Sequence, residues 1–194
     1  MLLRFLGRRP ESVPQPTPGV FDRAVEELYG SSRRIVELTI LIARAMGMRE
    51  DELENVRLGA LLHDIGMAGV PDEILFKTGS LTKEEREIIK RHPTYALEFL
   101  SGTPALAAAL EIPYCHHEQW DGTGYPRGLK GAEIPLAARI FAVVDVWVAL
   151  LSERPYRPAW TEEDAHAYIL QRAGRDFDPA VVEVFTKLLP PPGL

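Results

Sequence analysis

A nearly all-apolar run at residues 136–151 constrains the fold more than any other feature of the sequence. The run predicts one helix that is buried on most of its sides. It is shorter than the roughly 20 apolar residues that a membrane-spanning helix requires. We therefore expect this helix to lie in the core of a globular protein.

The rest of the chain carries helical patterns rather than sheet patterns. Apolar residues spaced three, four or seven apart predict one or two helices over 21–48, which Gly30 and the serines after it would interrupt, and further helices are expected over 50–65, 82–100, 105–117, 161–172 and 178–188. We expect Gly66 to close the second helix, a capping box at Thr82 to open the third, and Pro113 to kink or restart the fourth. The segments of alternating residues that a sheet needs are missing, so the predicted fold is all-α.

The chain is expected to hold one folded domain with short extensions. Residues 1–20 are a tail with a Pro-rich linker, residues 21–189 form the domain, and residues 190–194 are a Pro-rich tail. The net charge of −6 argues against a DNA-binding or RNA-binding protein. The single cysteine, Cys115, allows no internal disulfide, and the sequence shows neither a signal peptide nor a membrane span, so we expect a cytoplasmic protein.

Four of the five histidines lie beside other potential metal ligands or in the same helical neighbourhood: His63, His92, His116 and His117. Asp64 follows His63 at the end of an apolar helix, where two buried polar groups without partners would be unfavourable. Imidazole and carboxylate groups together suit Fe, Mn or Zn. Adjacent helical residues diverge by about 100°, so the doublet favours two metal ions with a bridging aspartate.

Asp145 is the only ionisable residue in the middle of the apolar run. An unpaired carboxylate in such surroundings would be very unfavourable. Two interpretations stay open: Asp145 is a metal ligand, or it forms a buried salt bridge with an arginine such as Arg139.

A series of short motifs runs through the folded part of the chain. The motifs are His63-Asp-Ile-Gly66, His92-Pro93, His116-His-Glu118, Asp121-Gly-Thr-Gly-Tyr-Pro126, Leu129-Lys-Gly131, Ile134-Pro-Leu136 and Asp145. In this order, and over roughly residues 25–188, they closely resemble the HD-GYP domains, a bacterial subgroup of the HD metal-dependent phosphohydrolases.

The resemblance implies an HD-domain helical bundle with a Gly-rich loop and a centre of two or three metal ions. Such a centre would hydrolyse cyclic di-GMP, a second messenger, to linear pGpG and then to GMP. We expect two ions, Fe or Mn, with Asp64 bridging them and His63 and Asp64 as the catalytic doublet. The implied metal ligands are His63, Asp64, His92, His116, His117 and Asp145.

The resemblance also implies a substrate-binding wall. Gly124, Tyr125 and Pro126 would support a guanine base, with the tyrosine ring as the stacking face. Arg154 and Arg157 match family positions that lie near the substrate phosphates.

Departures from the family pattern predict reduced activity. Met67 stands where the family usually has a lysine, and Val148 where it commonly has a second aspartate. Ser31 replaces the histidine that would hold a third metal ion together with Glu27, so a third ion is not expected.

Two alternative functions stay open, and the departures support the first of them. One is a degenerate module that binds cyclic di-GMP or other signalling proteins without turnover. The other is an HD hydrolase for a different phosphoester, which the Gly-Tyr-Pro loop argues against. The sequence predicts no oligomeric state.

Among the remaining residues, Cys115 and Trp147 are expected in the core and His166 on the surface.

Overall fold

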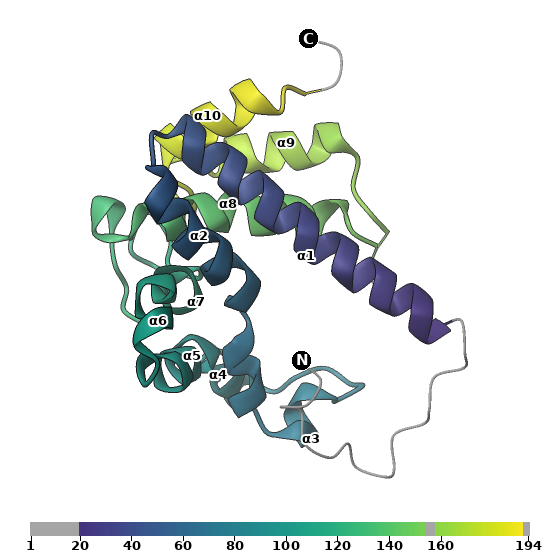
Figure 1. Ribbon diagram of the computed structural model, residues 1–194. Coiled ribbons are helices and arrows are strands. Elements are labelled where there is room, and N and C mark those ends of the chain that lie inside the picture. Colours follow the sequence, from purple (N-terminus) through teal and green to yellow (C-terminus); the bar gives the residue numbers. More distant parts are fainter. Residues whose placement is uncertain (1–19, 154–157, 192–194) are drawn as a thin grey trace.

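The computed structural model describes residues 20–153 and 158–191, without the side chains of 20–32 and 104–105. Within these ranges the protein is helical and contains no strand beyond an isolated bridge between Ala173 and Phe177 (Figure 1). The helices are α1 (Val20–Ala45), α2 (Glu50–Leu62), η2 (Ile65–Gly69), α3 (Asp72–Leu75), α4 (Lys83–Ile89), α5 (His92–Ser101), α6 (Pro104–Ala107), η3 (Ala108–Leu110), α7 (Glu111–Cys115), η4 (Gly131–Glu133), α8 (Leu136–Leu151), α9 (Glu162–Gln171) and α10 (Pro179–Leu188). The predicted all-α fold is confirmed.

Helix α8 has the predicted bounds and is the centre of the core. Ile140, Phe141, Val143 and Val144 have no exposed surface. Helix α1 lies across α8, while α9 and α10 lie side by side and also contact it (Figure 1). Full burial of one such side chain stabilises the fold by about 1.5–3 kcal/mol. The apolar run is therefore surrounded by the other helices, as its sequence predicts.

Helix α1 is continuous, so Gly30 and the serines after it do not interrupt it. Helix α2 ends at Leu62, three residues before the predicted end at Ile65. The prediction that Gly66 closes this helix is wrong, because Gly66 lies inside the 3-10 helix η2. A Cβ atom on Gly66 would collide with the carbonyl oxygen of His92, so glycine here permits η2 to pack closely against α5.

The single helix predicted over 82–100 is divided into α4 and α5. The capping box is confirmed: the Thr82 hydroxyl accepts from the backbone N–H of Glu85, and the Glu85 carboxylate accepts from the backbone N–H of Thr82. The chain breaks at Lys90 and Arg91 because Pro93 lies in the first turn of α5, where it disfavours a continuing helix before it. His92 consequently begins a new helix.

The helix predicted over 105–117 is also divided, into α6, η3 and α7. The division lies at 108–110 rather than at Pro113. Pro113 is tolerated because it falls in the first turn of α7, where backbone N–H groups need no partner within the helix. Helix α7 then ends at Cys115, directly before the pair of histidines.

Arg139 connects α8 to the start of α10. Its guanidinium donates to Asp178 at 2.6 Å and to the carbonyl oxygen of Ile134 at 2.8 Å. Asp178 in turn caps α10 by accepting from the backbone N–H of Ala180. The buried salt bridge of Arg139 is thus made with Asp178.

His166 lies in the core, which corrects the expectation that it is exposed. Only 3% of its surface is accessible, and its ring lies 4.7 Å from that of Trp147 and 5.2 Å from that of Phe185. The buried residues Ala165 and Ile169 share this face of α9, and the charged first turn hides that pattern in the sequence. The core positions of Trp147 and Cys115 are confirmed.

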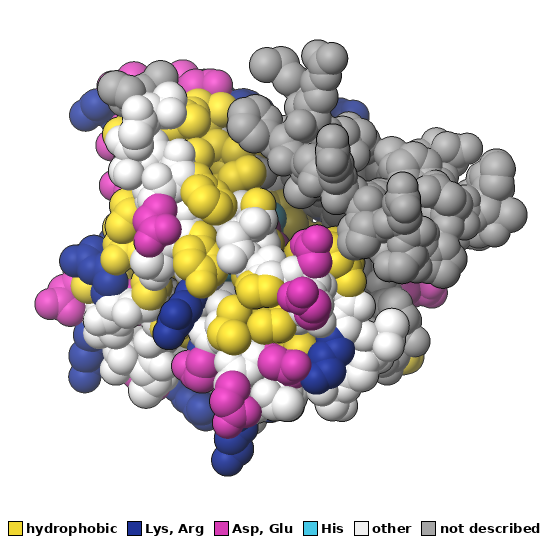
Figure 2. Space-filling view, turned by 90° about the horizontal axis from the view of Figure 1, so that it is seen from below, with side chains coloured by type: hydrophobic (Ala, Val, Ile, Leu, Met, Phe, Trp, Pro, Cys, Tyr) yellow, Lys and Arg dark blue, Asp and Glu magenta, His cyan; other side chains and the backbone are white. Residues whose placement is uncertain are grey.

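The exposed surface mixes apolar and charged side chains. Figure 2 shows this on the face at the α3–α5 end, where apolar side chains alternate with acidic and basic ones. A bilayer-spanning helix is not found among the described residues, since none there is both long and apolar enough.

Candidate metal centre

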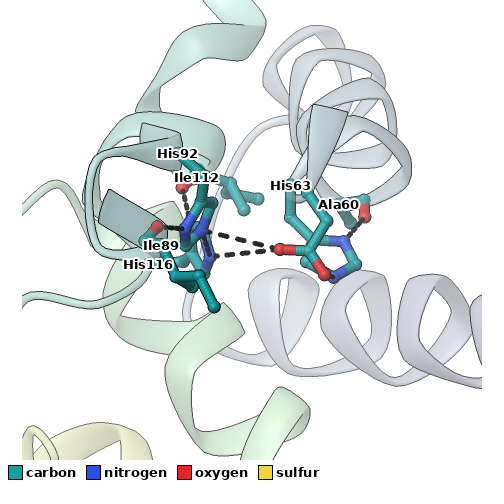
Figure 3. A network of polar contacts seen from close by, with 7 residues as sticks. Ala60, His63, Ile89, His92, Ile112 and His116 are labelled. Atoms are coloured by element: carbon teal, nitrogen blue, oxygen red, sulfur yellow. Dashed lines mark hydrogen bonds and ion pairs between the residues drawn. The ribbon is translucent and has the colours of Figure 1, made fainter. Parts of the chain in front are cut away.

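Helix ends bring five ligand-type side chains to one place. His63 caps the C-terminus of α2, Asp64 precedes η2, and His92 is the first residue of α5. His116 caps the C-terminus of α7, and His117 follows it. In Figure 3, His92 and His116 lie on one side of the cluster and His63 on the other.

Three of these histidines are oriented by backbone carbonyl groups one helical turn earlier. The Nδ1 atoms of His63, His92 and His116 donate to the carbonyl oxygens of Ala60, Ile89 and Ile112 at 2.8, 2.9 and 3.0 Å (Figure 3). A carbonyl oxygen can only accept, so Nδ1 carries the proton in each neutral ring. The Nε2 lone pair is then free, as it is in histidines that bind metal ions.

The free Nε2 atoms converge. Those of His92 and His116 are 3.3 Å apart, and the ligand atoms of His92, His116 and His117 all lie within 4.8 Å of one another. Two nitrogens bound to one ion at about 2.1 Å each lie about 3 to 3.5 Å apart. Two facing lone pairs repel each other unless a cation lies between them. This histidine cluster therefore fits a metal ion.

Asp64 lies between His63 and the other histidines. One carboxylate oxygen is 3.3 Å from Nε2 of His63, while the other is 3.5 Å from Nε2 of His92 and 3.9 Å from Nε2 of His116. The adjacent residues His63 and Asp64 can face each other because the helix ends between them. A carboxylate with one oxygen toward each group of histidines has the arrangement of a bridging ligand.

The electrostatics of the cluster match its geometry. Burial is the main cause that lowers the pKa of His116 and His117, to about 4 for His117, and the neighbouring imidazoles add to it. Burial opposes ionisation of Asp64, but its hydrogen bond with His63 and the other histidines outweigh burial and lower its pKa. At neutral pH the site offers the Asp64 carboxylate and the neutral imidazoles of His116 and His117, the protonation states that bind metal ions.

Asp145 belongs to the same region. Its helix α8 also presents Phe141, whose ring lies 4.9 Å from that of His63 and 5.9 Å from that of His116. Residues four apart share one face of a helix, so Asp145 lies on the face that meets the cluster. The charge of Asp145 also acts on His63: burial lowers the pKa of this histidine, but its hydrogen bond with Asp64 and the charges of Asp64 and Asp145 outweigh burial and raise the pKa.

Glu118 organises the Gly-rich loop, a role that the sequence analysis did not assign. Its side chain is almost fully buried, and its two carboxylate oxygens accept from the backbone N–H groups of Arg127 at 2.8 Å and Leu129 at 3.0 Å. The backbone N–H of Tyr125 donates to the carbonyl oxygen of His117. The loop is thereby folded back onto the histidine pair. An acidic residue beside two ligand-type histidines was the signal available in the sequence.

The loop places Tyr125 against the metal centre. Its ring stacks on that of His117 at 4.7 Å with an interplanar angle of 21°. A Cβ atom on Gly124 would collide with the backbone of Glu118 and Gln119, so glycine permits this close approach. Pro126, like Tyr125, is partly buried in the same wall.

Two of the residues that differ from the family pattern, Val148 and Met67, lie in different parts of the structure. Val148 is 5% exposed and packs in the hydrophobic core, whereas Met67 is partly buried in η2, three residues after Asp64. The side chains of Glu27 and Ser31 lie outside the described residues, as do Arg154 and Arg157.

Comparisons with known proteins agree on one family. The sequence pattern of the family described as the HD domain matches residues 20–181. A cyclic di-GMP phosphodiesterase response regulator from Xanthomonas campestris pv. campestris is 42% identical over 171 residues, 85% of this chain and 45% of the relative. A cyclic di-GMP phosphodiesterase from Thermotoga maritima is 44% identical over 164 residues, 84% of this chain and 45% of the relative.

A solved structure shares the fold. A protein from Bdellovibrio bacteriovorus, described as an HDG"Y"P protein, has a TM-score of 0.64 at 20% identity, covering 82% of this chain and 51% of the other. The chain thus spans about half the length or less of the proteins it matches.

Proposed function

Because the chain belongs to the HD-domain family, in its HD-GYP group, we propose that it is a metal-dependent phosphodiesterase that hydrolyses cyclic di-GMP. The observation that carries the proposal is the pair of Nε2 atoms of His92 and His116, 3.3 Å apart, with both Nδ1 atoms committed to carbonyl groups. Relatives at 42% and 44% identity are named for this activity.

The proposed centre holds two divalent ions, Fe or Mn. Asp64 would bridge them, and the remaining ligands would be His63, His92, His116, His117 and Asp145. Bound ions would lower the pKa of a water molecule and neutralise the phosphate under attack. The mixture of imidazole and carboxylate donors suits these metals.

The chain's own residues orient the substrate. Tyr125 offers an aromatic ring next to the centre, on which a guanine base can stack. Gly124 allows the close approach of the loop, Pro126 completes the wall, and Glu118 holds the loop in place. Arg154 and Arg157 are proposed to lie near the phosphates. The products would be linear pGpG, GMP or both.

The domain is proposed to comprise residues 21–189 and to act in the cytoplasm, where it would meet cyclic di-GMP and other signalling proteins.

A module that binds cyclic di-GMP without turnover is less well supported than an active enzyme. All six implied ligands are present in the sequence. An HD hydrolase for a different phosphoester is less favoured still, because the relatives at 42% and 44% identity are named cyclic di-GMP phosphodiesterases, whereas relatives named for 3'3'-cGAMP are 37–38% identical.

Chromatography of cyclic di-GMP incubated with Mn- or Fe-loaded protein tests the proposal. We expect conversion to the linear dinucleotide or GMP, lost after chelation and restored when the metal returns. The His92→Ala variant should be inactive, while His166→Gln, which changes a histidine remote from the cluster, should stay active. Intact cyclic di-GMP with both metals would contradict the proposal.

A further inference from the structure

Two charged side chains at the end of α4 lie beside Tyr125. The ammonium group of Lys90 donates to the Glu87 carboxylate at 2.7 Å and lies over the Tyr125 ring, 5.8 Å from its centroid. Side-chain exposure is 47% for Lys90 and 67% for Glu87, so a ligand can reach both. An accessible hydrogen-bond donor and an acceptor thus stand next to the aromatic ring.

Tyr125 lies between this pair and the metal centre. Its ring stacks on His117. Burial raises the pKa of Tyr125 to about 12, and the charges of Asp64 and Glu87 add to that effect. The phenol is therefore within electrostatic reach of both Asp64 and Glu87. Because His117 covers one face of the ring, a base would stack on the other face, within reach of the exposed side chains of Lys90 and Glu87.

The pair is chemically suited to the edge of a neutral base. Because the charge of Lys90 is compensated by Glu87, the pair attracts a phosphate less than a lone lysine would. Guanine presents acceptors at O6 and N7, to which lysine donates, and N–H donors that a carboxylate accepts. Adenine places its N6 amino group, a donor, where guanine has O6, so it would face the ammonium unfavourably.

We propose that Lys90 and Glu87 read the edge of the guanine that stacks on Tyr125, and so determine a preference for guanine over adenine dinucleotides. Lys90 would donate to O6, which adenine lacks, and Glu87 would accept from the N–H groups. The inference rests on the proposed function and specifies its substrate recognition.

Steady-state kinetics of the metal-loaded protein with cyclic di-GMP and cyclic di-AMP test this inference. In Glu87→Gln and in Lys90→Gln we expect the KM for cyclic di-GMP to rise about tenfold, with kcat within about twofold. The KM for cyclic di-AMP should not rise, so the guanine preference falls about tenfold. Lys90→Arg should restore most of the preference, because arginine also donates to O6 and N7.

Matched control variants distinguish a loss of base recognition from a general loss of activity. Glu98→Gln and Lys83→Gln remove the same charges from exposed positions of α5 and α4 and should keep the preference. Cleavage of bis(4-nitrophenyl) phosphate, which has no base to recognise, should be equal in all variants.

Three results would overturn the inference while leaving the proposed function intact: a wild-type protein without guanine preference, variants with unchanged preference, or an equal KM rise for both dinucleotides. A wild-type protein that cleaves neither dinucleotide would overturn the proposed function and this inference with it.

Discussion

Asp64 is the residue on which the metal centre depends most directly. Its two oxygens face His63 on one side and His92 and His116 on the other. The sequence predicts this bridging position from the His-Asp doublet alone. It does not predict how adjacent residues come to face each other, because that depends on where α2 ends.

Asp64→Asn should remove metal binding with little change in side-chain volume. The amide would lack the charge needed to hold the two proposed cations, and even changes outside the ligand shell cost about 10–100-fold in metal affinity or activity. We expect elemental analysis to show loss of metal and kinetics to show a loss of at least about 100-fold in kcat. Asp72→Asn, at an exposed position of α3, is the control. Full metal content in Asp64→Asn would rule out the bridging role.

Met67→Lys should restore a cation at the position where the family usually has one. A charge-assisted hydrogen bond to a phosphate contributes about 1.5–3 kcal/mol, or roughly ten- to hundredfold in binding or rate. We expect a higher kcat or a lower KM for cyclic di-GMP with unchanged metal content. Ala68→Lys, at the exposed neighbouring position, should show no such gain. Identical kinetics of Met67→Lys and wild type would show that this position does not reach the substrate.

At the scale of elements, α8 could be predicted to the residue, whereas the ends of the helices around the cluster could not. A long apolar run determines α8 locally. The end of α2, the break before His92 and the division at 108–110 depend on contacts between elements, such as the close approach of Gly66 to His92. Five of the six predicted ligands converge because of these ends, and the Gly-rich loop depends on hydrogen bonds between Glu118 and residues nine and eleven positions later in the chain.

Glu118→Gln should loosen the Gly-rich loop without emptying the metal centre. The carboxylate accepts from two backbone N–H groups, and an amide offers only one accepting atom, so a buried donor loses its partner at a cost of about 1–3 kcal/mol. We expect a lower melting temperature and a higher KM for cyclic di-GMP. Cleavage of bis(4-nitrophenyl) phosphate should be unchanged.

The matched control for Glu118→Gln is Glu133→Gln, since Glu133 accepts a backbone N–H at an exposed position. A Glu118→Gln variant with wild-type KM and melting temperature would show that the loop does not need this carboxylate.

At the scale of the whole molecule, the core contains a titratable group away from the metal cluster. His166 lies between Trp147 and Phe185, and burial lowers its pKa, opposed by the charge of Glu162. Protons therefore bind more readily to His166 in the unfolded chain than in the folded one. Above the pKa of about 6.5 that histidine has in an unfolded chain, protonation of His166 does not affect the free energy of unfolding. As the pH falls below that value, protonation favours the unfolded chain, and the free energy of unfolding decreases.

His166→Phe should reduce the acid sensitivity of the fold. Between about pH 7.5 and about pH 5.5, the melting temperature of the wild type should fall more steeply than that of the variant, because only the wild type gains a proton at this position on unfolding. Thermal unfolding of both proteins under the same metal conditions gives the two slopes. Equal slopes would show that His166 does not couple protonation to unfolding.

The metal content of the purified protein tests the central claim most directly. After loading with Mn or Fe and removal of free metal, elemental analysis should give about two ions per chain in the wild type. The exposed-site control Asp72→Asn should match the wild type, whereas Asp64→Asn should hold markedly less metal. A wild-type protein that retains no metal would contradict the account of the histidine cluster as a metal centre.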